Sequence, residues 1–104
     1  MNNQQDMDAK IGQAWKAHYD GDDASAVEMF LQLVEEDPNN IDALWGLGLS
    51  YRDLDDLENA VQAFQRVKEL VTRLLETEAG ELGRYFMLNR MVDQQLQQIG
   101  DFLG

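Results

Sequence analysis

The chain contains no cysteine, one proline and one histidine among its 104 residues. Without cysteine it forms neither a disulfide framework nor a thiolate nucleophile nor a sulfur-ligated metal site. No apolar run approaches the roughly 18 residues that a membrane span requires. The N-terminal segment MNNQQDMDAK lacks the basic and apolar regions of a signal peptide. We therefore expect a soluble, cytoplasmic protein that does not bind membranes.

Basic residues are also scarce, with 8 against 20 acidic residues and a net charge of −12. The imbalance lies in the first part of the chain, because residues 1–64 hold 14 acidic and 3 basic residues. Such a surface repels the phosphates of nucleic acids, so we expect no nucleic-acid partner. The charge is compatible with a basic protein partner. The alternative is that the acidic surface only keeps the protein soluble.

The sequence repeats itself after 34 residues. With this shift, DASAVEMF at 23–30 lies over LENAVQAF at 57–64. Apolar residues recur at the three- and four-residue spacing of amphipathic helices in each unit. This spacing predicts an all-α protein of five antiparallel helices at about 8–19, 24–36, 41–52, 57–77 and 82–103.

Proline and polar residues mark the ends of these helices. Pro38 ends the second helix, and Asn40 is suited to cap the third through its side-chain oxygen. Asp56 is the corresponding cap of the fourth helix. The apolar pattern of that helix continues past the position at which the first repeat ends. The chain then turns around residues 80–83.

The second unit resembles a tetratricopeptide repeat. The family's signature positions hold Leu44, Leu47, Gly48, Tyr51, Ala60 and Phe64. The first unit keeps Ala14, Ala26, Phe30 and Pro38, but it has polar Lys10 and Gln13 in place of Leu44 and Leu47. The resemblance covers about residues 7–72.

This resemblance implies a right-handed α-α superhelix and a role in protein–protein interaction. We expect a flexible N-terminus at 1–7 and a single domain at 8–104. That domain comprises repeats at about 7–40 and 41–74 and a capping helix at about 82–103, which covers the apolar end of the stack.

No combination of residues in the sequence indicates an enzyme. The acidic turns at 20–23 and 53–56 do not follow the spacing of a calcium-binding loop, and their aspartates suit helix capping instead. His18 has no cysteine or hydroxyl partner with which to form a nucleophilic pair. The sequence therefore predicts no catalytic residue, no metal ligand and no cofactor.

The family resemblance implies a concave groove lined by the first helix of each repeat. By helical spacing, each of these two helices presents four residues on one side, so that the predicted partner-binding set is Ile11, Trp15, His18, Tyr19, Asp42, Trp45, Leu49 and Arg52. Tryptophan, tyrosine and arginine dominate binding hot spots. The alternative is that both tryptophans belong to the core or lie under the last helix. The family's best-known ligand, a C-terminal carboxylate held by lysine, arginine and asparagine, is not expected, because Ile11, Trp15 and Gly46 stand on these helices.

The last helix carries apolar residues on more than one face. One face is suited to packing on the fourth helix, which leaves Phe86, Met87 and Met91 for a second partner or for the core of a small protein. The leading hypothesis is a non-catalytic module that binds a peptide or helix of another protein in the groove. The alternative is a structural unit that forms a homodimer through its C-terminal helices.

Overall fold

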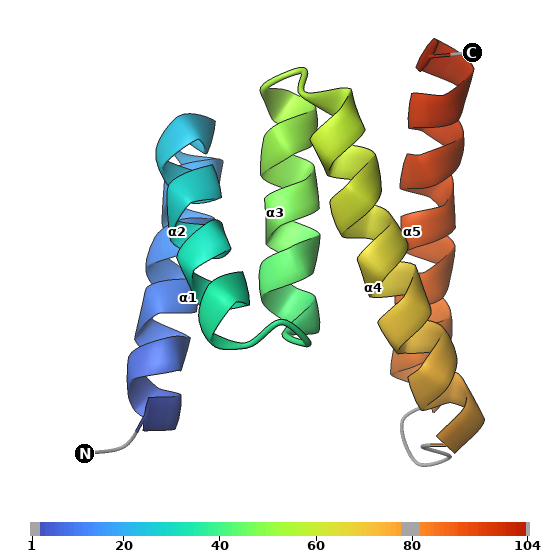
Figure 1. The fold of residues 1–104 in the computed structure, drawn as a ribbon, viewed down its shortest axis with the longest axis horizontal. Coiled ribbons are helices and arrows are strands. Elements are labelled where there is room, and N and C mark those ends of the chain that lie inside the picture. Colours follow the sequence, from blue (N-terminus) through green and yellow to red (C-terminus); the bar gives the residue numbers. More distant parts are fainter. Residues whose placement is uncertain (1–2, 78–81, 104) are drawn as a thin grey trace.

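The computed structural model describes residues 3–77 and 82–103, and within these ranges it contains five helices and no strand (Figure 1). The predicted all-α, tetratricopeptide-like fold is confirmed. The helices are α1 (Asn3–Tyr19), α2 (Asp23–Glu36), α3 (Ile41–Asp53), α4 (Leu57–Thr77) and α5 (Leu82–Leu103).

Four of the helices begin and end within one residue of the predicted positions, but α1 begins at Asn3 instead of Asp8. Residues 3–7, which we expected to be flexible, are therefore helical. Met7 explains part of this extension, because it is partly buried against the same core as Ile11, one helical turn further on. Residues 1–2 lie outside the described part of the chain, as do residues 80 and 81 of the predicted turn, whereas 82 and 83 already belong to α5.

Side-chain caps begin the helices as the sequence predicts. The Asn40 side chain accepts a hydrogen bond from the backbone N–H of Ala43 at 3.1 Å, which confirms it as the N-cap of α3. Asp56 accepts in the same way from the N–H of Asn59, at 3.4 Å. The turns before α2 and α4 also match, since Gly21 (φ 86°) and Asp55 (φ 64°), 34 residues apart, both adopt left-handed backbone conformations.

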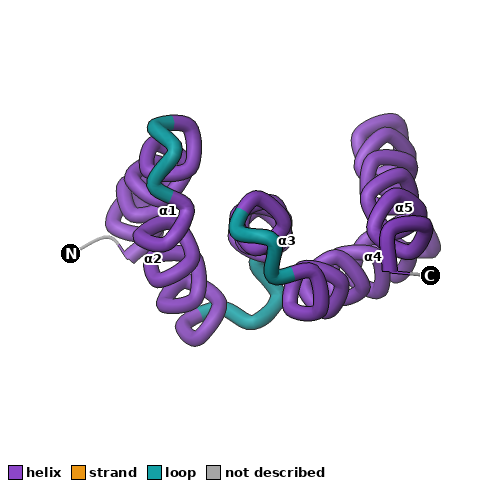
Figure 2. The backbone as a smooth tube through the Cα atoms, turned by 90° about the horizontal axis from the view of Figure 1, so that it is seen from above, coloured by secondary structure: helices purple, strands orange, loops and turns teal. Residues whose placement is uncertain are grey.

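The helices form a curved array, with α1, α3 and α5 on its inner side and α2 and α4 on its outer side (Figure 2). We call the inner side the concave face. Each helix packs mainly on its neighbours in the sequence, and α1 also contacts α3. Leu47 of α3 is buried with Phe30 of the first repeat, whereas Leu44 is buried with Phe64 of the second. The third helix therefore joins two core regions into one stack.

Two glycines of α3 allow the closest approaches in the stack. A Cβ atom on Gly46 would lie 2.3 Å from Cζ of Phe30, and one on Gly48 would lie 2.5 Å from Cε1 of Phe64. Phe30 belongs to the preceding repeat and Phe64 to the same repeat, and both side chains are fully buried. The absence of two side chains on α3 thus sets the spacing both within and between repeats.

The last helix is held by α4. Val92 and Ile99 are buried in one core cluster with Val67 and Val71 of α4, and Lys68 of α4 forms an ion pair with Asp93. Over the described residues, no Cα atom of α5 comes within 8 Å of one in α3. The two helices are bridged by one hydrogen bond, from Nη1 of Arg52 to Oε1 of Gln95 at 2.9 Å. None of the helices, as far as the structure describes them, combines the length and apolar character needed to cross a membrane.

Candidate functional site on the concave face

The concave face begins with an aromatic group on α1. Trp15 stacks on Tyr19 with ring centroids 5.8 Å apart, and it forms a T-shaped pair with Phe30 whose centroids lie 5.3 Å apart. Its Nε1 donates a hydrogen bond to Oδ1 of Asp42 on α3 at 3.1 Å. Trp15 is half-buried, while Tyr19 is largely exposed. The indole therefore links the two repeats and still presents part of its surface to solvent.

Trp45 lies one step further along the concave face. It is half-buried, and its ring packs at a tilt on Phe64 with centroids 5.2 Å apart. Its remaining surface lines a pocket of about 400 Å³ between α3 and α5. We call this the α3–α5 pocket, and the residues that line it are Ile41, Asp42, Trp45, Arg84, Tyr85, Met87, Leu88 and Met91.

The pocket exists because α5 does not pack on α3 as α3 packs on α1. The first and third helices are in backbone contact, whereas the third and fifth are not. Trp45 fills only part of the space that this separation leaves. The other wall comes from Met87 and Met91, and Met87 is 64% exposed.

One group of each charge borders this apolar pocket. Asp42 accepts the Trp15 hydrogen bond through Oδ1 and is otherwise exposed to solvent. Arg84, in the first turn of α5, is exposed and forms no ion pair with any residue that the structure describes. An apolar floor between two opposite charges is suited to a ligand with an apolar group and polar ends.

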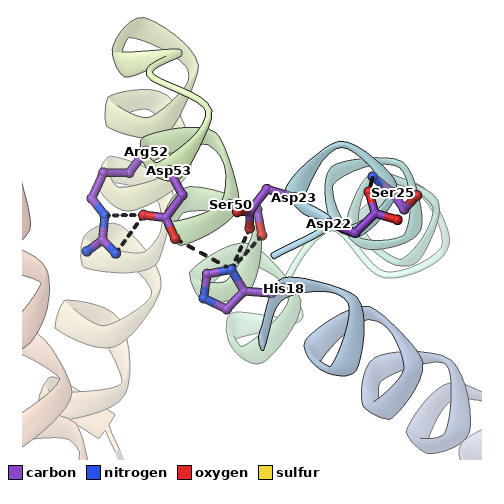
Figure 3. A network of polar contacts seen from close by, with 7 residues as sticks. All are labelled: His18, Asp22, Asp23, Ser25, Ser50, Arg52 and Asp53. Carbon is purple, nitrogen blue, oxygen red and sulfur yellow. Dashed lines mark hydrogen bonds and ion pairs between the residues drawn. The ribbon is translucent and has the colours of Figure 1, made fainter. Parts of the chain in front are cut away.

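His18 lies beneath the concave face. Its side chain is 10% exposed, and its Nδ1 lies 2.6 Å from Oδ1 of Asp23 and 3.5 Å from Oγ of the fully buried Ser50 (Figure 3). Asp53 approaches the same nitrogen with its Oδ2 at 3.8 Å. This polar cluster connects α1, α2 and α3 at the end where the α1–α2 and α3–α4 turns lie.

The structure therefore brings together most of the residues singled out in the sequence. Trp15 and Asp42 are hydrogen-bonded to each other, and Arg52 forms a hydrogen bond with Gln95 of α5. Ile11 is partly buried against the core cluster around Phe30, and Leu49 is partly buried against the cluster around Phe64. Trp45 shares one pocket with Met87 and Met91, which the sequence assigned to a separate interface. Phe86, 56% exposed, is not among the pocket-lining residues.

Sequence reasoning missed Arg84, Leu88 and Gln95 on α5. A signal for them exists, because residues 84, 88, 91 and 95 follow one another at three- and four-residue spacing and so share a helix face with Met87. The polar cluster around His18 gave no such signal, because its members lie in separate turns. Two of them, Asp23 and Asp53, are 30 positions apart in the sequence.

The comparison with protein families agrees with this geometry. The family model of the tetratricopeptide repeat matches residues 42–70, which span α3 from its second residue and the first two-thirds of α4. No curated protein and no solved structure matches the chain significantly.

Proposed function

Because the chain carries a tetratricopeptide repeat, a unit of protein–protein interaction modules, we propose that it is a non-catalytic module that binds a peptide or helix of a partner protein on its concave face. The α3–α5 pocket is the single observation that carries the proposal. It is apolar at its floor, open to solvent and lined by Trp45 and two methionines. A hollow lined mainly by apolar side chains, with a few polar groups at its border, is the usual form of a binding site.

The pocket is suited to one large apolar side chain of the partner. A volume of about 400 Å³ falls in the range of sites that enclose most of a small ligand. Methionine side chains adapt to the shape of an apolar group, which favours partners that present different residues at this position. The partner's flanking residues would meet Asp42 and Arg84. The net charge of −12 favours rapid association with a basic partner.

The experiment selects peptides from a random display library on the purified chain. It then measures the dissociation constant of a selected peptide for the wild type and for Trp45→Ala. We expect the substitution to raise the dissociation constant at least about tenfold, since a buried tryptophan at the centre of an interface contributes most to binding. Leu31→Ala is the matched control, because Leu31 is a partly exposed apolar residue on α2, on the outer side of the array.

Two results would contradict the proposal. One is a selection that yields no peptide against the folded chain. The other is a peptide that binds the Trp45→Ala variant as tightly as it binds the wild type, since the α3–α5 pocket would then play no part.

The alternative function, a homodimer through α5, is favoured by the exposure of Phe86. Phe86 stands outside the α3–α5 pocket, so a second copy could cover it without filling the pocket. Light scattering after size-exclusion chromatography distinguishes the two functions. A mass of two chains that falls to one in Phe86→Glu supports the homodimer, whereas a wild-type mass of one chain at every concentration excludes it.

A further inference from the structure

Three potential metal ligands from three different helices meet at the end of the array that holds the α1–α2 and α3–α4 turns. His18 belongs to the last turn of α1, Asp23 begins α2, and Asp53 ends α3. One nitrogen or oxygen atom from each lies within 4.8 Å of the others (Figure 3). The fold alone produces this group, because the sequence places the two aspartates in separate turns.

The surroundings of the group leave its ligand atoms directed toward one another. The side chains of His18 and Asp23 are 10% and 11% exposed, and that of Asp53 is 35% exposed. Arg52 donates to Oδ1 of Asp53 from both Nε and Nη2, at 3.0 and 2.9 Å, which leaves Oδ2 facing the imidazole. Among the described residues, the one nitrogen of a basic side chain within 4.0 Å of the Asp23 carboxylate is Nδ1 of His18. A largely buried carboxylate is stabilised by a hydrogen-bond donor, a positive charge or a metal ion beside it.

We infer that Nδ1 of His18, Oδ1 of Asp23 and Oδ2 of Asp53 form a binding site for a divalent transition metal ion of the zinc type. Imidazole nitrogen together with carboxylate oxygen is a donor set that suits Zn²⁺. Ca²⁺ and Mg²⁺ prefer six or more oxygen ligands and are not expected to bind here. The metal ion binds the lone pair of Nδ1, and the neutral imidazole then carries its one proton on Nε2.

The distances fit such a site after small side-chain rotations. Zinc lies about 2.0–2.2 Å from imidazole nitrogen and carboxylate oxygen, so two ligand atoms of a tetrahedral site are roughly 3.4 Å apart. Nδ1 lies 2.6 Å from the Asp23 oxygen and 3.8 Å from the Asp53 oxygen, and all three ligand atoms lie within 4.8 Å of one another, so no distance changes by more than about 1.4 Å. Oγ of Ser50, 3.5 Å from Nδ1, adds a further polar group beside the three ligand atoms.

A metal ion in this position would join both repeats. The helices that supply its ligands belong to the first repeat (α1 and α2) and to the second (α3). The ion would therefore stabilise the packing of the first repeat on the second, next to Trp15, whose ring centroid lies 5.8 Å from that of His18. The inference is independent of the proposed peptide binding.

The test is a calorimetric titration of the intact chain with Zn²⁺. Salt near physiological strength and an excess of Mg²⁺ suppress unspecific binding to the acidic surface. We expect one ion per chain and a rise in the midpoint of thermal unfolding, because the folded chain alone has the site. His18→Gln and Asp53→Asn should each weaken binding more than about tenfold, because each lacks one ligand. Circular dichroism checks that both variants remain folded.

Asp55→Asn is the matched control, because Asp55 is an exposed acid in the same turn as Asp53 and asparagine tolerates its left-handed backbone. It should bind Zn²⁺ as tightly as the wild type. A second readout requires no variant: His18 is the one histidine of the sequence, so the histidine ring signals in a nitrogen NMR spectrum must shift as one equivalent of Zn²⁺ is added. Histidine signals that do not shift, or equal losses of affinity in Asp55→Asn and His18→Gln, would overturn the inference and leave a His18–Asp23 ion pair alone.

Discussion

At the scale of single residues, the two buried glycines of α3 carry the tightest constraint. A Cβ atom on Gly46 or Gly48 would overlap the ring of Phe30 or Phe64, and both rings are enclosed on all sides. We predict that Gly46→Ala and Gly48→Ala each lower the free energy of unfolding by about 1–3 kcal/mol, the usual cost of overpacking a core. Urea denaturation measures the change.

Gly12 is the control for these substitutions, because it occupies in α1 the repeat position of Gly46. A Cβ atom there would have no neighbour within 4 Å. Gly12→Ala should therefore stabilise the chain by about 0.5–1 kcal/mol, since alanine restricts the unfolded backbone and favours the helix. Equal effects at positions 12 and 46 would show that Phe30 does not constrain α3.

The phenol of Tyr51 gives a prediction for alkaline pH. Its burial, and then the negative charge of Asp56, raise its pKa above the ordinary value of about 10. At a pH above 10 the unfolded chain therefore loses this proton while the folded chain still holds it. The unfolded state then binds fewer protons, and the free energy of unfolding falls as the pH rises further.

Tyr51→Phe should remove this part of the pH dependence and leave the stability at neutral pH nearly unchanged. The free energy of unfolding is to be measured in urea at several pH values on either side of 10. The absorbance of ionised tyrosine provides a second measurement, in which the phenol that titrates last should be absent from the variant. An identical alkaline decline in the wild type and the variant would contradict the assignment to Tyr51.

At the scale of elements, the packing of α5 on α4 contains one unsatisfied group. Oδ1 of Asn89 is buried and has no hydrogen-bond partner within the described structure, although it lies on the helix face that also buries Val92. A buried acceptor without a partner costs about 1–3 kcal/mol. We predict that Asn89→Leu raises the free energy of unfolding by up to this amount, as measured in urea.

Gln94→Leu is the control for α5, because Gln94 is exposed on the same helix and its substitution should change the stability by less than about 0.5 kcal/mol. A loss of stability in Asn89→Leu would mean that the carboxamide has a partner, such as a bound water molecule.

The elements also show what could be predicted from the sequence. Apolar periodicity, Pro38 and the Asn40 cap locate the ends of α2 and α3, because these signals are local. The start of α1 could not be predicted, because residues 3–6 are polar and their helix is supported by Met7 packing on the core. The helical spacing predicts that Trp15 and Asp42 both line the groove, but only the fold shows that they are hydrogen-bonded to each other.

The position of α5 could not be predicted for a different reason. Its angle to α3 depends on how side chains such as Val92 and Ile99 fit between it and α4, which periodicity does not encode. The sequence alone therefore predicts Met87 and Met91 as part of a possible dimer interface, and the fold adds that both line the α3–α5 pocket with Trp45. The cluster around His18 could not be predicted from the sequence, because its residues meet only when the α1–α2 turn and the end of α3 lie side by side.

At the scale of the whole molecule, the two halves of the concave face are held in different ways. The α1–α3 contact is part of the packed core, but one side-chain hydrogen bond between Arg52 and Gln95 spans the other half of the face. The width of the α3–α5 pocket is thus set by the tilt of one helix on α4. Under the proposed function, a different tilt of α5 would change the width of the pocket without altering the contact between α1 and α3. The half of the concave face around Trp15 is thus fixed by helix packing, and the half around Met87 and Met91 by the angle of a single helix.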